Sequence, residues 1–148
     1  MESRIFLFFV IITGSVFTTE KQDIIDVLEK YNKAFGEADY SGIINFFDRP
    51  SSFNLKDKTV IASSRLKLKL IYRKLRGSLP DYYAYSKWEQ IDIKLIDDSI
   101  AIVNADFSRY KHDNTIFYSG SAQYHLRLKN GEWGIFSLTP YSNIKIIN

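Results

Sequence analysis

The sequence is poor in the residues that carry metal and thiol chemistry. Its 148 residues include no cysteine, two histidines and a single methionine. Without cysteine the chain can form no disulfide, no thiolate zinc site and no thiol nucleophile. The two histidines, His112 and His125, lie far apart and lack the spacing of metal ligands, so we expect no metal centre.

The composition is otherwise that of one ordinary domain with many aromatic rings. The length favours a single domain that can bury one core, and 45% hydrophobic with 25% charged residues is usual for a globular protein. Aromatic residues make up 16%, with ten Tyr and eleven Phe. This content suits a sheet-rich core, a ring-lined cavity, or both. The net charge of +3 is only weak support for an anionic partner.

The sequence also lacks an apolar run long enough for a stable membrane span. The longest, Ile5–Phe17, would form a helix of roughly 20 Å against a hydrocarbon core of ~30 Å. A basic residue before the run and small residues behind it are typical of a secretory signal peptide. We therefore predict a signal peptide at 1–19, cleaved after Ser15 or Thr18, and one domain at 20–148.

Export bears on where this protein works. A cysteine-free exported chain fits a bacterial periplasm or the exterior, so we predict a periplasmic or secreted protein. In the alternative interpretation, the apolar N-terminal run is a strand or helix of the folded domain.

Four runs rich in Ile, Val, Tyr, Phe and Trp occupy the C-terminal half of the chain. Turn sequences such as Asp97-Asp98-Ser99 and Lys129-Asn130-Gly131 separate them. Short β-rich runs closed by Asp, Asn and Gly predict antiparallel strands joined by hairpins. The predicted strands are Trp88–Ile96, Ile100–Tyr110, Phe117–Leu128 and Trp133–Leu138.

Upstream, the patterns predict three helices and a small hairpin. Thr19 starts a capping box with Gln22, and apolar residues follow at spacings of three and four up to Ala38. Asp39 can cap a short second helix that runs to Phe47. The predicted hairpin pairs Phe53–Leu55 with Thr59–Ile61, and a third helix starts at Ser63 or Ser64, buries Leu66, Leu70, Ile71 and Leu75, and ends near Gly77 and Pro80.

The third helix is strongly basic. Such a run is usually the solvated side of a packed helix, and the alternative is a docking face for nucleic acid or an anionic membrane. Export and the absence of RNA-binding motifs argue against nucleic acid. The basic residues are Arg65, Lys67, Lys69, Arg73, Lys74 and Arg76.

This order of elements, together with three local signatures, resembles the nuclear transport factor 2-like superfamily, which includes SnoaL-like and ketosteroid isomerase-like domains. The signatures are Tyr31-Asn-Lys-Ala-Phe-Gly-Glu-Ala-Asp39, Phe46-Phe47-Asp48-Arg49-Pro50 and the segment from Tyr124 to Phe136. The resemblance covers Asp23 to Tyr141 and is greatest to small exported bacterial members. It implies an α+β, cystatin-like cone in which three N-terminal helices pack on a strongly bent, mostly antiparallel sheet around an apolar cavity.

Strand alternation predicts which side chains face that cavity. Small residues on the inward side leave volume that Leu or Ile would fill in a packed core; they are Ala101, Ala105, Gly120 and Ala122. Tyr31, Phe107, Arg109 and Tyr124 should point into this space, and we predict that they bind a ligand. Alternatively, the two tyrosines are core rings with satisfied hydroxyls, and Arg109 forms a surface ion pair with Asp106 or Asp113.

The catalytic positions of ketosteroid isomerase-like domains can be compared with the residues of this sequence. Ketosteroid isomerase-like members use a tyrosine on the first helix, which Tyr31 matches. Their aspartate base would fall near Asn54–Leu55, where this chain has no carboxylate, and their strand acid falls on Tyr124. Asp48 and Asp57 could lie near the mouth as bases, or be turn and cap residues. No catalytic residue is assigned.

Three functional hypotheses follow. The first is an exported domain that binds a small hydrophobic molecule in the cavity. The second is a cofactor-independent SnoaL-like enzyme, an isomerase, cyclase, dehydratase or hydrolase acting on such a molecule. The third is a partner-binding module, a homodimer through the outer sheet face with Trp88, Gln90, Gln123 and His125. We expect no cofactor and no nucleic-acid partner.

Overall fold

The computed structural model describes residues 14–141, with side chains from 19 onward. Most of the predicted signal peptide therefore lies outside the described residues, and export remains a prediction. The helical elements are α1 (Gly14–Gly36), α2 (Tyr40–Ile43), the 3₁₀ turn η1 (Ile44–Phe46) and α3 (Arg65–Gly77). No helix in this part of the chain is long and apolar enough to cross a bilayer.

Six strands form one sheet in the order β2-β1-β6-β5-β4-β3. All neighbours pair antiparallel except β1 and β6, which run parallel. The predicted four-strand meander is confirmed as β3 to β6, with strands longer than the hydrophobic runs suggested. The strands are β1 (Phe47–Asn54), β2 (Thr59–Ala62), β3 (Tyr83–Leu95), β4 (Ile100–Lys111), β5 (Ile116–Lys129) and β6 (Glu132–Tyr141).

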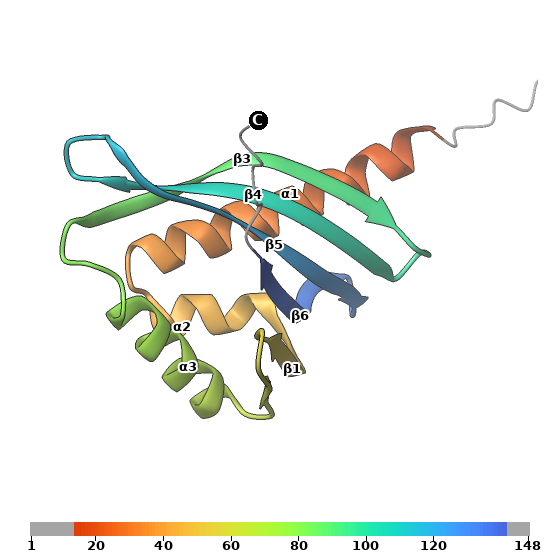
Figure 1. The fold of residues 1–148 in the computed structure, drawn as a ribbon. Coiled ribbons are helices and arrows are strands. Elements are labelled where there is room, and N and C mark those ends of the chain that lie inside the picture. The colour runs from red at the N-terminus through yellow and green to blue at the C-terminus, as the bar shows by residue number, and fades with distance from the viewer. Residues whose placement is uncertain (1–13, 142–148) are drawn as a thin grey trace, which may run out of the picture.

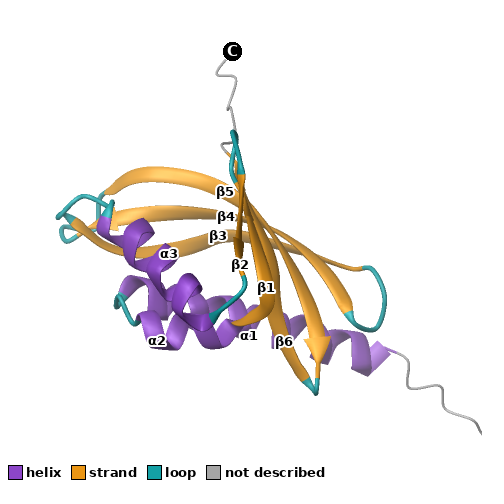
Figure 2. Ribbon diagram, turned by 90° about the horizontal axis from the view of Figure 1, so that it is seen from below, coloured by secondary structure: helices purple, strands orange, loops and turns teal. Residues whose placement is uncertain are grey.

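The helices lie on one side of the bent sheet, with α1 running beneath β3 to β5 (Figures 1 and 2). The core forms where the apolar stripe of α1 meets the inward residues of the sheet: Ile24, Leu28, Val103 and Leu126 are fully buried. This arrangement is the α+β cone that the resemblance implied.

The helix boundaries correct two predictions. Because α1 already begins at Gly14, Thr19 lies inside the helix and is not its N-cap. Phe47 opens β1 and does not belong to the second helix. Two predicted caps are confirmed: Asp39 accepts a hydrogen bond from the Gly42 amide (2.9 Å), and Ser64 starts α3 in the same way.

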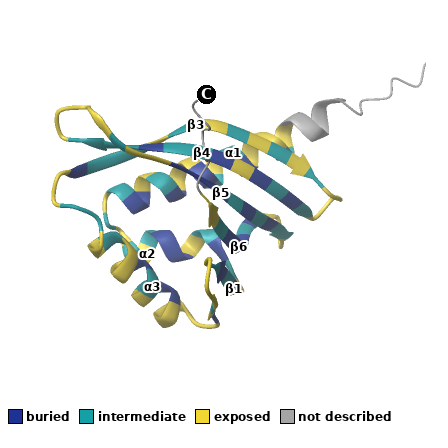
Figure 3. Cartoon of the chain, viewed as in Figure 1, coloured by how far each residue is buried: buried dark blue, intermediate teal, exposed yellow. Residues whose placement is uncertain are grey.

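The predicted buried stripe of α3 is wrong except at Ile71, which is partly buried against the core. Leu68 and Tyr72 are fully buried, whereas Leu66 and Leu70 are 68% and 54% exposed. Both pairs have the i, i+4 spacing of a helix face, and the two faces differ by about 200° of rotation. Figure 3 shows the exposed residues along the outer side of α3. Local periodicity could not choose between the pairs, because the choice depends on which side chains pack against α1 and β1.

A β-bulge corrects the predicted orientation of Trp88. Trp88 pairs with Phe107, Gln90 pairs with Asp106, and the register shifts between them. The extra residue turns Trp88 to the concave side and Gln90 to the outer side, although regular alternation would put both on one face. The Trp88 indole N–H donates to the Leu28 carbonyl at 3.3 Å. Trp88 therefore does not belong to the outer sheet face.

Candidate functional site

The concave side of the sheet encloses a cavity of about 120 Å³ that opens to solvent. Residues from α1, α3 and five strands surround it, and most are aromatic or aliphatic. All four residues predicted from the sequence line this cavity: Tyr31, Phe107, Arg109 and Tyr124. The other lining residues are Asn32, Phe35, Phe53, Leu55, Leu75, Ser86, Trp88, Ala122, Leu138 and Pro140.

The small inward residues explain only part of this volume. Ala101, Ala105 and Ala122 are buried as expected, but of these only Ala122 lines the cavity. At Gly120, an added Cβ would lie 2.8 Å from the Tyr118 ring and 3.1 Å from Phe107. Those two rings therefore occupy the space that the glycine leaves, and Gly120 does not line the cavity.

Three phenols cluster at the inner end of the cavity. The Tyr72 hydroxyl donates to the Tyr31 hydroxyl at 3.1 Å, and the Tyr31 ring packs edge-to-face against both Tyr72 and Tyr124, with centroids 6.0 Å apart. Burial raises the pKa of Tyr31, and it raises the pKa of Tyr72 and of Tyr124 well above the usual range. All three are therefore neutral near pH 7 and keep an O–H donor.

Tyr72 is the residue of this phenol cluster that the sequence reasoning missed. It does not line the cavity, but it holds the hydroxyl of Tyr31, which does. Because Tyr31 accepts the hydrogen bond of Tyr72, its own O–H can donate to a ligand. A signal was present in the sequence, since Tyr72 lies four residues after Leu68 and so shares its helix face.

Among the described residues that line the cavity, Arg109 is the one with a cationic side chain. Its Nε is buried and has no hydrogen-bond partner among the residues whose side chains are described. Its guanidinium carbon lies 5.2 Å from the Phe107 ring centroid and 5.0 Å from that of Tyr118. The cation is also near the phenols: burial raises the pKa of Tyr124, and the charge of Arg109 offsets part of that rise.

The ion pair considered for Arg109 is not found. The ion pairs formed among residues 19–141 do not include it. Asp106, on the outer face, accepts a hydrogen bond from Ser121 at 2.5 Å, and Asp113 accepts one from Thr115 within its turn. Arg109 thus enters the cavity with its charge uncompensated by any carboxylate that the structure describes.

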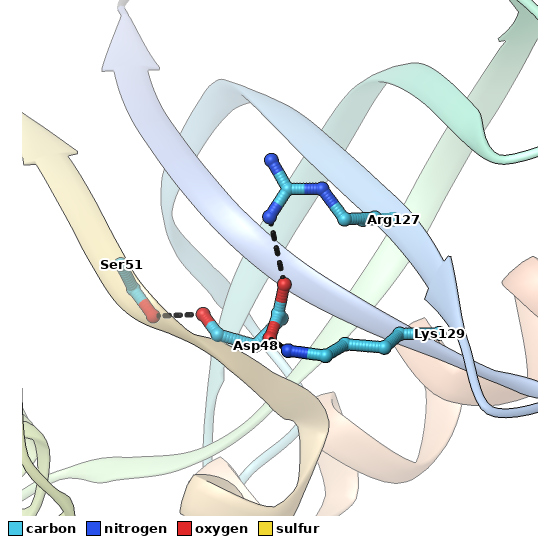
Figure 4. A network of polar contacts seen from close by, with 4 residues as sticks. All are labelled: Asp48, Ser51, Arg127 and Lys129. Carbon is cyan, nitrogen blue, oxygen red and sulfur yellow. Dashed lines mark hydrogen bonds and ion pairs between the residues drawn. The ribbon is translucent and has the colours of Figure 1, made fainter.

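Asp48 does not line the cavity, so the structure does not support the alternative in which it acts there as a base. Its carboxylate pairs with Arg127 at 2.8 Å and Lys129 at 3.6 Å, and Ser51 donates to its backbone carbonyl (Figure 4). This cluster joins β1 to the end of β5, outside the lining of the cavity. Asp57 is exposed in the turn between β1 and β2.

The position of the isomerase base also holds no acid. Asn54 donates to the hydroxyls of Ser137 and Thr139 at 2.9 and 3.1 Å, and Leu55 is an apolar part of the lining. Within the described part of the chain, no group of His, Asp and Glu could hold a metal ion. The site therefore offers neutral phenols, one guanidinium and many rings, which suits binding better than proton transfer.

Comparisons with known proteins agree with the fold. A family model described as NTF2-like protein (DUF6841) matches residues 20–143, and no curated protein matches the chain. A solved cystatin-like protein of unknown function from Nostoc punctiforme is similar at a TM-score of 0.71 and 11% identity, over 84% of this chain and 92% of its own.

Two further solved structures are similar. An NTF2-like protein of unknown function from Shewanella oneidensis has a TM-score of 0.65 and 16% identity, over 82% of this chain and 98% of its own. An NTF2-like protein from Novosphingobium aromaticivorans has a TM-score of 0.69 and 9% identity, over 88% of this chain and 86% of its own. At these identities the likeness establishes the fold alone.

Proposed function

Because the chain belongs to the NTF2-like family described as DUF6841, we propose that it is an exported binding domain for a small apolar molecule that carries one acidic group. The observation that carries this proposal is Arg109, which lines a mostly apolar cavity and whose buried Nε has no hydrogen-bond partner among the described residues. Export rests on the N-terminal sequence, as argued above.

The acidic group of the proposed ligand is inferred from the unpartnered buried donor of Arg109. A buried donor without a partner costs free energy, about 1–3 kcal/mol or more for a charged group. A ligand carboxylate can accept from a guanidinium through two parallel hydrogen bonds, which no neutral group of similar size can match. The described lining residues include no Asp or Glu that could serve in its place.

The size of the cavity limits the apolar part of the ligand. Drug-sized ligands occupy roughly 300–1,000 Å³, whereas an apolar cavity of about 150 Å³ holds benzene. At about 120 Å³, the cavity suits a single ring or a short branched chain. A longer ligand would extend past Leu55 and Leu75 at the mouth, both of which are about 40% exposed.

The phenols favour a ligand whose polar atoms sit together. Tyr31 and Tyr124 are neutral donors that line the same cavity as Arg109. They can add hydrogen bonds to a carboxylate held by the guanidinium. The enzyme hypothesis lacks such support, since no carboxylate or histidine among the described lining residues can act as a base.

A titration followed by tryptophan emission tests the proposal. Trp88 lines the cavity, so an entering ligand should change its emission. We expect phenylacetate and benzoate to bind and their uncharged amides to bind at least tenfold more weakly. Equal affinity for acid and amide would overturn the role of Arg109. Native mass spectrometry of protein purified from its own host would then identify the natural ligand.

A further inference from the structure

The outward face of α3 exposes leucines that the core does not use. Leu66 and Leu70 are 68% and 54% exposed, on the side of the helix opposite the buried Leu68 and Tyr72. Exposed leucines one helical turn apart form an apolar strip, since residues at i and i+4 are neighbours on a helix surface. Figure 3 shows this side of α3 as exposed over its length.

Three cations flank these leucines. At about 100° per residue, Arg73 lies on one side of the strip, and Lys74 and Lys67 lie on the other. Their side chains form no hydrogen bond or ion pair with any residue for which the structure describes a side chain. The helix, RLKLKLIYRKLRG, contains no acidic residue that could neutralise them.

The other three cations of α3 have structural partners. Arg65 donates to Asn45 and Lys69 to Ser41, each at 3.0 Å. Arg76 donates to the Phe35 carbonyl at 3.3 Å and stacks on the Tyr83 ring. The basic character of α3 thus divides into a set that attaches the helix to the domain and a set that faces outward.

We propose that the docking face, defined as Leu66, Lys67, Leu70, Arg73 and Lys74, binds the surface of an anionic lipid bilayer. An apolar strip bordered by Lys and Arg is the pattern of a helix that lies in the membrane interface. The leucines enter the boundary between headgroups and acyl chains, and the cations meet the anionic headgroups. This inference does not depend on the proposed function of the cavity.

The leucines decide between a bilayer and other anionic partners. A nucleic acid would satisfy the three cations through its phosphates, but it would leave Leu66 and Leu70 facing a charged backbone. The docking face also has no aromatic side chain on which a base could stack. An anionic bilayer can bind both the leucines and the cations of the docking face.

The docking face and the cavity lie on different sides of α3. Leu75, near the end of the same helix, lines the cavity, but at about 100° per residue it lies opposite Leu66. The docking face can therefore contact a bilayer without covering the cavity.

Vesicle co-flotation of the full chain tests this proposal. The vesicles contain phosphatidylcholine alone or with 30% phosphatidylglycerol, in 50 mM or 500 mM salt. We expect binding only with phosphatidylglycerol, and its loss at 500 mM salt. Each cation near an anionic surface raises the affinity for the membrane roughly fivefold. The triple variant K67Q/R73Q/K74Q should therefore bind the vesicles about a hundredfold more weakly.

Matched variants separate the docking face from net charge. K21Q/K30Q/K94Q removes the same charge from exposed positions elsewhere and should lose far less affinity. L66S/L70S should bind at least tenfold more weakly while keeping the dependence on salt. Residues 1–19 are identical in all variants, so they cannot produce these differences in vesicle binding. Circular dichroism checks that each variant folds.

Three results would overturn the inference. The wild-type chain could fail to float with anionic vesicles, both triple variants could lose the same affinity, or L66S/L70S could bind as wild type. A chain that binds heparin at 50 mM salt but not vesicles would point to a soluble polyanion as the partner.

Discussion

The hydroxyl of Tyr72 donates to the hydroxyl of Tyr31 over 3.1 Å and so joins the buried face of α3 to that of α1. The Tyr72 ring also packs against Phe35, Phe47 and Phe53, with centroids 5.5 to 6.2 Å apart. This contact fixes the rotation of α3, which leaves Leu66 outside, and it holds Tyr31 at the inner end of the cavity.

Tyr72→Phe tests the hydrogen bond without removing the ring. We expect the free energy of unfolding to fall by about 1 kcal/mol, because a buried acceptor loses its donor. Urea unfolding measures this change. The control is Tyr82→Phe at an exposed ring, which should leave stability unchanged. Equal effects in the two variants would mean that the contact between Tyr72 and Tyr31 adds nothing.

The buried phenols should make the fold sensitive to alkali. Burial raises the pKa of Tyr72 and Tyr124 above the value of about 10 that phenols have in the unfolded chain. Above pH 10 the unfolded state therefore loses protons that the folded state keeps, and stability falls as pH rises. Urea midpoints between pH 8 and 11 should decline less steeply in Tyr72→Phe than in wild type. A parallel decline would contradict the assignment.

Arg109→Gln tests the acidic group of the ligand. We expect affinity for a carboxylate ligand to fall roughly 10- to 100-fold, since hydrogen bonds to charged groups contribute about 1.5–3 kcal/mol. Stability should hold or rise, because the buried unpartnered Nε is removed. Calorimetric titration measures the affinity, and Arg49→Gln is the control at an exposed arginine outside the cavity. If both variants bind alike, the guanidinium of Arg109 does not hold the ligand.

Ala122→Leu tests whether the cavity has free volume. Ala122 lines the cavity, so a larger side chain can enter it, block the ligand and cost less than the roughly 1–3 kcal/mol of overpacking a filled core. Ala105→Leu is the matched control, because Ala105 is 1% exposed and lies outside the lining. It should destabilise the fold by about 1–3 kcal/mol. A larger loss at Ala122 than at Ala105 would show that the space is filled.

Asp48→Asn tests whether the ion pairs of Asp48 with Arg127 and Lys129 contribute to stability or to ligand binding. The partners Arg127 and Lys129 are 43% and 63% exposed, so solvent screens both ion pairs and we expect a cost of no more than about 1 kcal/mol. Ligand affinity should not change, because Asp48 is outside the cavity lining. Urea unfolding and the same titration check both points. A loss of binding would show that Asp48 contributes to the ligand site.

The sequence predicted most of the fold because its signals are local. Alternation along β4 and β5 identified the inward faces, and hairpin chemistry between Asp97 and Ser99 and at Gly131 separated the strands. The same alternation placed Phe107, Arg109 and Tyr124 on the wall of the cavity. Periodicity in α1 placed Tyr31 opposite them.

The rest depended on contacts between segments that are far apart in sequence. The rotation of α3 follows from the packing of Tyr72 against α1 and β1, and the inward turn of Trp88 follows from a bulge against β4. The position of Asp48 follows from its pairing with two cations on β5. Periodicity along one segment fixes which residues share a face, whereas only packing against other segments decides which face turns inward.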